Sequence, residues 1–197
     1  DQFVWPSNGQ IGFKLEVPPL HPVLMATKLT GLAHSHAALM QQFNQLQVII
    51  ALLRDGFHPD SQGGTVLLSE NGEPVVDYPI SDYVWQGAQS AYLAMAELQF
   101  AAGAKSVLPI HQDAQLYSSW GQAREAIKAL PLQKYRATLA SAHVMGGCNM
   151  SAEPAKGVVN LQGRHHQLEN LSVFDGSVLP SSLGANPQLT IYALVSV

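Results

Sequence analysis

A chain of 197 residues with 47% apolar and 12% charged residues is long enough to bury a core and too apolar for a disordered protein. Its net charge of −4 provides no basic surface, which argues against nucleic acid as a partner. The single cysteine, Cys148, excludes an intrachain disulfide and a cysteine-based zinc site. No apolar run approaches the roughly 20 residues of a membrane-spanning helix, so no transmembrane segment is expected, and the compartment stays unknown.

The two ends of the sequence suggest a fragment of a longer protein. The first residues, Asp1 to Trp5, show neither an initiator methionine nor the pattern of a signal peptide. The last residues, 192–197, break off within an apolar helical pattern. The charged fraction is also low against a typical value of about 25%, which suggests that another protein part or a partner covers much of the surface.

The first quarter of the chain predicts a strand followed by a helical region. Residues 9–17 alternate apolar and polar side chains, the period of a half-buried strand. Pro18 and Pro19 end that strand, because proline cannot donate to a ladder. Residues 30–54 are mostly compatible with a helix, since their apolar side chains recur near helical spacing, and Gly56 follows as part of a stop signal.

A β-hairpin is predicted next. Residues 64–70 and 74–78 are two apolar runs on either side of Asn71 and Gly72. An Asn-Gly pair between two such runs is a strong hairpin signal, because both central residues of the favoured turn take positive φ.

Two helices follow the hairpin. The first ends by Ala104, with Ser81 or Asp82 as its N-terminal cap and Gly103 where a C′ glycine belongs. The second helix is predicted over residues 120–129.

After residue 141 the sequence changes character, because glycines and short polar loops replace helices. Brief strands are predicted over residues 157–160 and 170–175. A final helix is predicted to begin at Pro187, where a missing N–H costs nothing.

Three features of this last region are candidates for chemistry. His143 precedes Gly146 and Gly147, and its ring can titrate near neutral pH, so it can act as a general base or acid toward a bound cofactor. Alone, it is more simply a loop histidine before a turn. Asp175 and Gly176 stand at the predicted end of a strand, where open α/β sheets bind ligands, although an ordinary strand-to-loop turn is the better interpretation of these residues taken alone.

The third feature is Asn186, which precedes Pro187 at the start of the last helix. The free N–H groups and the positive dipole end of a helix suit an electron-rich ligand edge. The simpler interpretation is that Asn186 is an N-terminal cap.

Other constellations are weaker. Cys148 with His143 suggests a thiol hydrolase, but no orienting third group is evident and a small buried thiol is the better interpretation. His165 and His166 are adjacent and point to opposite faces of a strand, and His34 and His36 do not face each other on a helix. The sequence therefore predicts no metal site.

Four motifs in order make residues 141–196 resemble the C-terminal region of the glucose–methanol–choline (GMC) family of flavin oxidoreductases. That region carries a His-x-x-Gly-Gly/Thr-Cys-x-Met segment, a Gly-Arg segment, an Asn-Leu-x-Val-x-Asp-Gly/Ala-Ser-x-x-Pro strand and Asn-Pro-x-x-Thr-Ile. They stand here at residues 143–150, 163–164, 170–180 and 186–191. The Gly-Gly-Cys and Asp-Gly-Ser forms look most like the branch with cholesterol oxidases and bacterial alcohol dehydrogenases. A looser likeness to that family's substrate-binding domain extends over residues 63–104.

The resemblance implies a fold of α+β or α/β class. Residues 1–140 would form part of a substrate-binding domain, with an antiparallel sheet backed by helices. Residues 141–197 would form the C-terminal segment of an incomplete, Rossmann-like FAD-binding domain. The family's Gly-x-Gly-x-x-Gly fingerprint is absent from this sequence, so the missing N-terminal region is expected as a partner that binds the rest of the cofactor.

The resemblance also implies roles, namely FAD-dependent oxidation of a small-molecule alcohol by hydride transfer to the flavin N5. His143 matches the catalytic histidine beside N5, and Asn186 matches the residue that orients the substrate hydroxyl. The match implies that Asp175, Gly176, Pro187 and Gln188 lie at the cofactor, with Gly176 near the diphosphate and ribityl region and the Gln188 backbone at the pyrimidine edge.

Two points depart from the family pattern. The related branch also uses a glutamate from the substrate domain, and Glu70, Glu73 and Glu97 are all candidates without a matching motif. The missing fingerprint motivates an alternative in which the chain keeps the fold but serves as a non-catalytic binding or assembly module.

Overall fold

The computed structural model describes residues 2–4, 9–61 and 63–196. The chain divides into two compact units: unit 1 comprises Asp1–Leu53 and Ile80–Leu139, and unit 2 comprises Arg54–Pro79 and Ala140–Val197. Both contain helices or short antiparallel strands, so the α+β class is confirmed, whereas the Rossmann-like part stays a prediction. The assignment of residues 1–140 and 141–197 to substrate and flavin domains also stays a prediction, and residues 54–79 belong to the same compact unit as the C-terminal segment.

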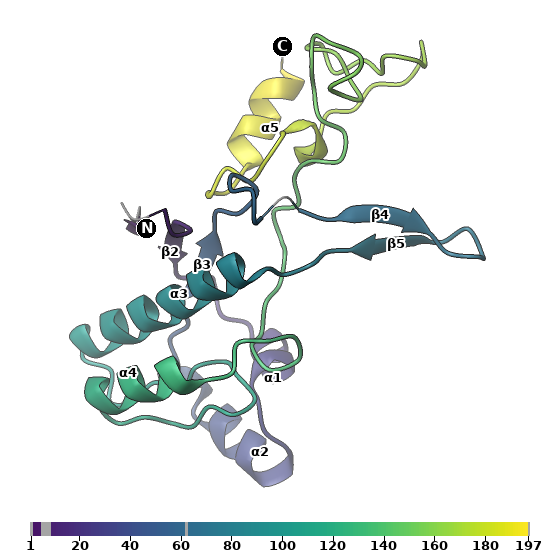
Figure 1. The fold of residues 1–197 in the computed structure, drawn as a ribbon. Coiled ribbons are helices and arrows are strands. Elements are labelled where there is room, and N and C mark those ends of the chain that lie inside the picture. The colour runs from purple at the N-terminus through teal and green to yellow at the C-terminus, as the bar shows by residue number, and fades with distance from the viewer. Residues whose placement is uncertain (1, 5–8, 62, 197) are drawn as a thin grey trace. The chain divides into compact units, whose positions relative to one another are not determined.

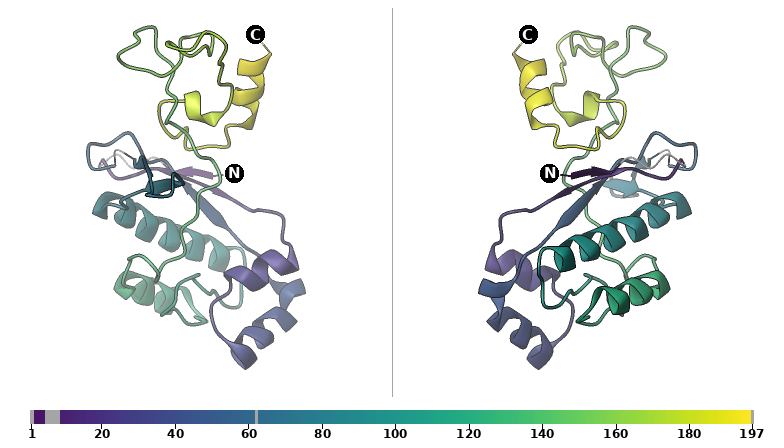
Figure 2. Two further views of the ribbon diagram at one scale, coloured as in Figure 1. Left: turned by 90° about the vertical axis from the view of Figure 1, so that its right-hand side faces the viewer. Right: turned by 90° about the vertical axis from the view of Figure 1, so that its left-hand side faces the viewer.

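Unit 1 contains a three-stranded antiparallel sheet in the order β1-β2-β3, formed by β1 (Gln2–Val4), β2 (Phe13–Glu16) and β3 (Ile50–Leu53). Its helical elements are α1 (Pro22–Lys28), α2 (Ala33–Gln41), the 3₁₀ turn η1 (Phe43–Gln45), α3 (Asp82–Ala101) and α4 (Trp120–Ala129). Figure 1 shows α3 and α4 side by side, and both views in Figure 2 show α3 along the sheet.

The predicted strand over residues 9–17 is confirmed as β2, and the prolines follow its end. It is not half-exposed, however, because Lys14 is only 6% exposed and its ammonium donates to Glu16 at 3.1 Å. Both faces of β2 are therefore covered, and the polar face carries a charge pair.

The prediction that residues 30–54 are mostly helical is wrong at their C-terminal end. Ile50–Leu53 is strand β3, which pairs with β2 in the register Ile50↔Glu16 to Leu53↔Phe13. The apolar spacing of this segment fits a helix or a strand. The segment is a strand because it pairs with β2 and packs on α3. The helix α1 was not predicted, because its seven residues have no side-chain cap and no acidic first turn.

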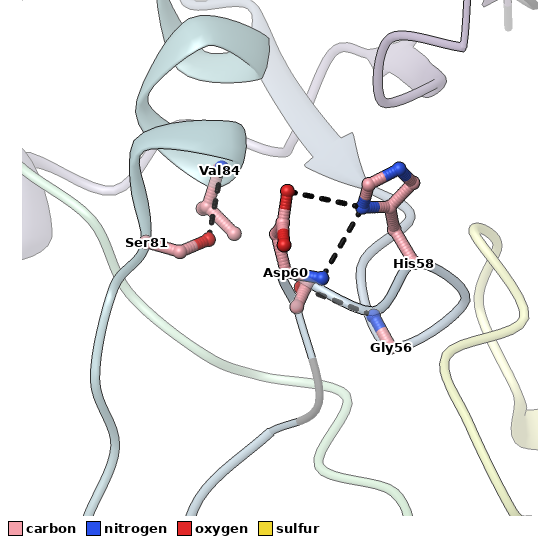
Figure 3. Close-up of polar contacts among 6 residues, drawn as sticks. Gly56, His58, Asp60, Ser81 and Val84 are labelled. Carbon is pink, nitrogen blue, oxygen red and sulfur yellow. Dashed lines mark hydrogen bonds and ion pairs between the residues drawn. The ribbon is translucent and has the colours of Figure 1, made fainter.

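The two long helices are confirmed, and so is the predicted cap of the first. Ser81 Oγ accepts from the Val84 N–H at 3.4 Å at the start of α3, as Figure 3 shows. At its end Gly103 has φ +92°, and the N–H groups of Gly103 and Ala104 donate back into the last turn. The helix α4 begins after the cap Ser119.

Small residues let α3 approach its neighbours closely. Ala91 packs with Phe13 and Leu15 of the sheet, and Ala96 packs with Ala123 and Ile127 of α4. At Gly87 the approach is closest, because a Cβ there would lie 1.6 Å from Ile11 Cγ2. A β-branched, fully buried neighbour cannot give way easily, so the glycine sets this contact.

Unit 2 contains the hairpin of β4 (Thr65–Leu68) and β5 (Pro74–Asp77), the 3₁₀ turn η2 (Gly176–Val178) and α5 (Gln188–Val195). The predicted hairpin is confirmed, and Figure 1 shows it as an extended two-stranded arm. Its turn differs from the expected Asn-Gly type, because of the two residues only Gly72 has positive φ, at +79°. The Gly72 N–H donates to Ser69 O and the Ser69 N–H to Glu73 O, as in a type I turn with a glycine bulge.

Side-chain bonds anchor the loop that leads into the hairpin. The Tyr78 hydroxyl at the end of β5 donates to the Asp55 carboxylate. Burial and this carboxylate raise the pKa of Tyr78 above its usual range. Between Asp55 and Tyr78, the Asp60 N–H donates to His58 Nδ1 at 3.2 Å (Figure 3). The Gly56 N–H donates to the Ser61 hydroxyl at 3.3 Å.

The predicted strands over residues 157–160 and 170–175 are not regular strands in the structure. They form only isolated bridges, such as Arg164↔Ser172, within loops. A strand is stable when its neighbours complete the ladder, and the described residues supply only short pairs here. Asp175 consequently does not end a strand but stands before the 3₁₀ turn η2.

Replacing Gly87 by alanine should lower the free energy of unfolding by about 1–3 kcal/mol, because overpacking against Ile11 outweighs the gain of up to about 1 kcal/mol in helix propensity. Gly121 of α4 is the matched control, since a Cβ there meets nothing within 4 Å. Denaturant unfolding followed by tryptophan fluorescence measures both variants. Equal stability of Gly87→Ala and Gly121→Ala would contradict the close contact.

Candidate functional site

Two of the predicted site residues meet in unit 2. The Asn186 amide nitrogen lies 3.4 Å from His143 Nε2, although the two residues are 43 positions apart. His143 is half-buried on the loop after residue 140, and Asn186 is exposed just before α5. Because an amide nitrogen only donates, Nε2 is the acceptor of this contact.

Backbone pairing holds the loop that carries His143. The Cys148 N–H donates to Ser177 O at 3.0 Å, and the Met150 N–H donates to Val178 O at 3.1 Å, so the loop follows η2. Between these bonds and His143, Gly146 and Gly147 have φ of +79° and +91°. Two consecutive left-handed residues require glycine in practice, which explains the Gly-Gly pair of the motif.

Gly176 is the point where three segments converge. A Cβ at this buried residue would lie 2.7 Å from the Val144 carbonyl oxygen and 3.7 Å from Ile191 Cδ1. Val144 follows His143 directly, and Ile191 belongs to α5 behind Asn186. Packing within this chain is therefore sufficient reason for a glycine at position 176.

Asp175 stabilises the turn next to that glycine. Its carboxylate accepts from the Ser177 N–H at 2.8 Å and also from the Ser177 hydroxyl. These two bonds, the hydroxyl first, lower the pKa of Asp175 below its usual range. The carboxylate is thus already engaged within its own turn.

The start of α5 is shaped by the residues before it. Pro187 stands at the cap position, and its carbonyl accepts from the Ile191 N–H at 2.9 Å. The preceding turn passes closely over Arg54, since a Cβ at Gly184 would lie 2.9 Å from the Arg54 side chain. The Arg54 guanidinium in turn lies 4.0 Å from the centre of the Phe57 ring.

His143 and Asn186 line a shallow hollow of about 340 Å³ on unit 2, here called the concave site. Its walls are mainly apolar and come from the His143 loop and the first turns of α5, and they comprise Ala142, His143, Asn186, Pro187, Gln188, Ile191 and Tyr192. Four of the six predicted site residues therefore lie together. Asp175 and Gly176 do not line the concave site, but Gly176 packs against the loop and the helix that form it.

Sequence reasoning missed Tyr192 in this wall. The Gln188 side-chain amide donates to Tyr192 Oη at 2.6 Å, across one turn of α5. The spacing of four residues in the final helix was the available signal, because such residues share a helix face.

The weaker sequence candidates do not join the concave site. Cys148 is half-buried. His165 Nδ1 accepts from the Gln167 N–H at 3.0 Å, whereas His166 Nε2 donates to Ser151 O at 3.1 Å, so the two rings serve different loops. None of Glu70, Glu73 or Glu97 is among the described residues of its wall.

The described residues contain neither a metal cluster nor a membrane-spanning helix. No group of three or more His, Cys, Asp or Glu side chains there is placed to hold a metal ion. Within the same residues, no helix combines the length and apolarity needed to cross a membrane.

Comparison with known protein families gives a match that includes the concave site. The GMC oxidoreductase family model matches residues 59–194, more than half of the chain. The chain belongs to the GMC oxidoreductase family. The match includes both residues of the His143–Asn186 pair.

Named relatives of this GMC chain are much longer. A long-chain-alcohol oxidase of Arabidopsis thaliana is 25% identical over 188 residues, 91% of this chain and 25% of the relative. An uncharacterized GMC-type oxidoreductase of Sinorhizobium fredii is 29% identical over 136 residues, 69% of this chain and 27% of the relative. A cholesterol oxidase of Acinetobacter baumannii is 52% identical over 54 residues, 27% of this chain and 10% of the relative. The chain thus spans about a quarter of the length of the first two relatives.

Replacing Gly176 by alanine should separate the His143 loop from η2, because the new Cβ meets a carbonyl oxygen rather than a flexible side chain. The expected result is a large chemical-shift change at His143 and Asn186 in NMR spectra and a loss of stability of about 1–3 kcal/mol. Gly121→Ala of α4 is the control, since a Cβ there meets nothing within 4 Å. Unchanged His143 signals in Gly176→Ala would show that the loop does not depend on this contact.

Removing the Ser177 hydroxyl should raise the pKa of Asp175 toward its ordinary value, because that hydrogen bond is the largest cause of the lowering. The backbone bond remains, so part of the lowering persists. A lowered folded pKa means that Asp175 stabilises η2 above the ordinary carboxyl pKa and ceases to do so as the pH falls through the folded value. Carbon NMR titration of Ser177→Ala tests this, and an identical midpoint in both proteins speaks against the bond.

Proposed function

We propose that this chain contributes the alcohol-handling part of an FAD-dependent oxidoreductase that acts on CH–OH groups. GMC oxidoreductases oxidise alcohols and related groups, and the proposal assigns this activity to the enzyme that carries this chain. The observation that carries it is the His143–Asn186 pair, an acceptor nitrogen and a donor amide 3.4 Å apart at the wall of the concave site.

The geometry of the pair suits an alcohol hydroxyl. A contact of 3.4 Å is at the long end for a hydrogen bond and weak, so a ligand can replace it at little cost. A hydroxyl placed between the two side chains would accept from the Asn186 amide and donate its proton to His143 Nε2. His143 is thus proposed as the general base and Asn186 as the residue that orients the alcohol oxygen.

The residues around the pair fit a flavin. The first N–H groups of α5 have no partner within the helix and carry the positive end of its dipole, which suits an electron-rich ring edge. Pro187 and Gln188 form this helix start beside His143, and both line the concave site. When bound, FAD supplies the hydride acceptor for oxidation of the alcohol carbon.

Asp175 and Gly176 are proposed to support the cofactor site through the backbone turn that they form. Gly176 lets the His143 loop and α5 approach each other, and Asp175 holds the turn in which it lies. Their backbone would meet the middle of the cofactor, as the family resemblance implies. Residues 1–140 are proposed as part of the substrate domain and residues 141–197 as part of the flavin domain.

Replacing His143 by alanine in the FAD-loaded enzyme that carries this chain should lower kcat by roughly 10²–10⁴ for an accepted alcohol. The flavin absorbance spectrum should stay the same, because the side chain handles the proton rather than the cofactor. His34→Ala is the matched control, since His34 is an exposed histidine of α2 in unit 1.

Full turnover in His143→Ala would remove the general-base role. It would favour the alternative in which the chain is a non-catalytic binding or assembly module. Loss of the flavin spectrum in the same variant would instead assign His143 to cofactor binding.

A further inference from the structure

Tyr192 is the one phenol among the described residues of the concave-site wall. It stands on α5, four residues after Gln188 and six after Asn186, and it is 57% exposed. Its ring is therefore accessible from the hollow that His143 and Asn186 line. Neither the general-base role nor the proposed helix–flavin contact uses this side chain.

A second side chain determines which hydrogen bond Tyr192 can still make. The Gln188 amide nitrogen donates to Tyr192 Oη at 2.6 Å, so the phenol oxygen acts as an acceptor in that pair. A phenol has one O–H group of its own, which remains available as a donor. The contact joins two side chains that lie on the same face of α5, one helical turn apart.

The rest of the wall indicates what that donor would meet. Ala142, Pro187 and Ile191 are apolar, whereas His143 and Asn186 are already paired with each other. The described wall carries no carboxylate and no lysine or arginine. Such a wall suits an uncharged ligand with aliphatic carbon and at least one acceptor oxygen.

We propose that Tyr192 is a substrate-positioning residue whose hydroxyl, held by Gln188, donates a hydrogen bond to an oxygen of the bound alcohol. This inference rests on the proposed oxidation of an alcohol at His143 and Asn186. Tyr192 would select for uncharged alcohols, because an ammonium group cannot accept the bond and an apolar group leaves the hydroxyl without a partner.

Tyr192→Phe tests the hydroxyl with little change in ring shape. In the FAD-loaded enzyme with an accepted uncharged alcohol, KM should rise about threefold to tenfold while kcat stays within about twofold, as expected for the loss of one neutral hydrogen bond. Gln188→Leu keeps the backbone N–H and should raise KM by at most the same factor, because the Tyr192 hydroxyl remains but loses its partner. The double variant should be no worse than Tyr192→Phe alone, because Gln188 acts through the hydroxyl that this substitution removes.

Tyr135→Phe is the matched control, since Tyr135 is 95% exposed in unit 1. The flavin absorbance spectrum and bound FAD content are recorded for every variant. An unchanged KM in Tyr192→Phe overturns the inference, and so does additive behaviour of the two substitutions. A loss of bound FAD in Tyr192→Phe also overturns it, because the hydroxyl would then hold the cofactor.

His143→Ala in the same assay distinguishes a failure of the Tyr192 role from a failure of the proposed alcohol oxidation. If His143→Ala loses turnover but Tyr192→Phe keeps its KM, only the role of Tyr192 fails. If neither substitution changes the kinetics, the proposed function fails as well.

Discussion

The site depends on one close approach, the contact of Gly176 with the backbone of Val144. Because the α-carbon of Gly176 has no side chain, the His143 loop can lie against η2, and Ile191 of α5 can pack on the same residue. Hydrogen bonds from the loop to η2 then continue the contact toward Met150. The distance between His143 and Asn186 is thus a consequence of backbone packing rather than of attraction between the two side chains.

For the proposed function, this arrangement matters because the contact between His143 and Asn186 is long and weak. The scaffold positions the two groups, so a ligand hydroxyl need not compete with a strong bond between them. Asp175 contributes by holding the turn at Gly176, where its charge is satisfied by Ser177. Asp175 therefore supports the site from within its own turn, and the described wall residues include no carboxylate, lysine or arginine.

Exposed apolar surface is the other prominent property of the chain. Every residue of β4 and β5 is exposed, including Val66 at 69% and Leu68 at 76%. On α5, Leu189 is 81% exposed. The low charged fraction of the sequence agrees with this observation, because such surface is usually covered in a working protein.

The sequence by itself determined the elements with strong local signals. Ser81 and Gly103 delimit α3 through a cap and a left-handed turn, and the hairpin follows from two apolar runs around a glycine. The ordered motifs also led to the GMC family, which the family match over residues 59–194 shows. These features could be predicted because their causes lie within a few residues of each other.

Tertiary structure alone decided the rest, since the causes lie far apart in the chain. Ile50–Leu53 is a strand because β2 lies beside it, whereas its apolar spacing also fits a helix. Residues 170–175 form a loop in place of the predicted strand, because the described residues offer only short pairs to complete a ladder. The meeting of His143 with Asn186, and the place of Tyr192 in the same wall, likewise follow from packing around Gly176 that no local pattern encodes.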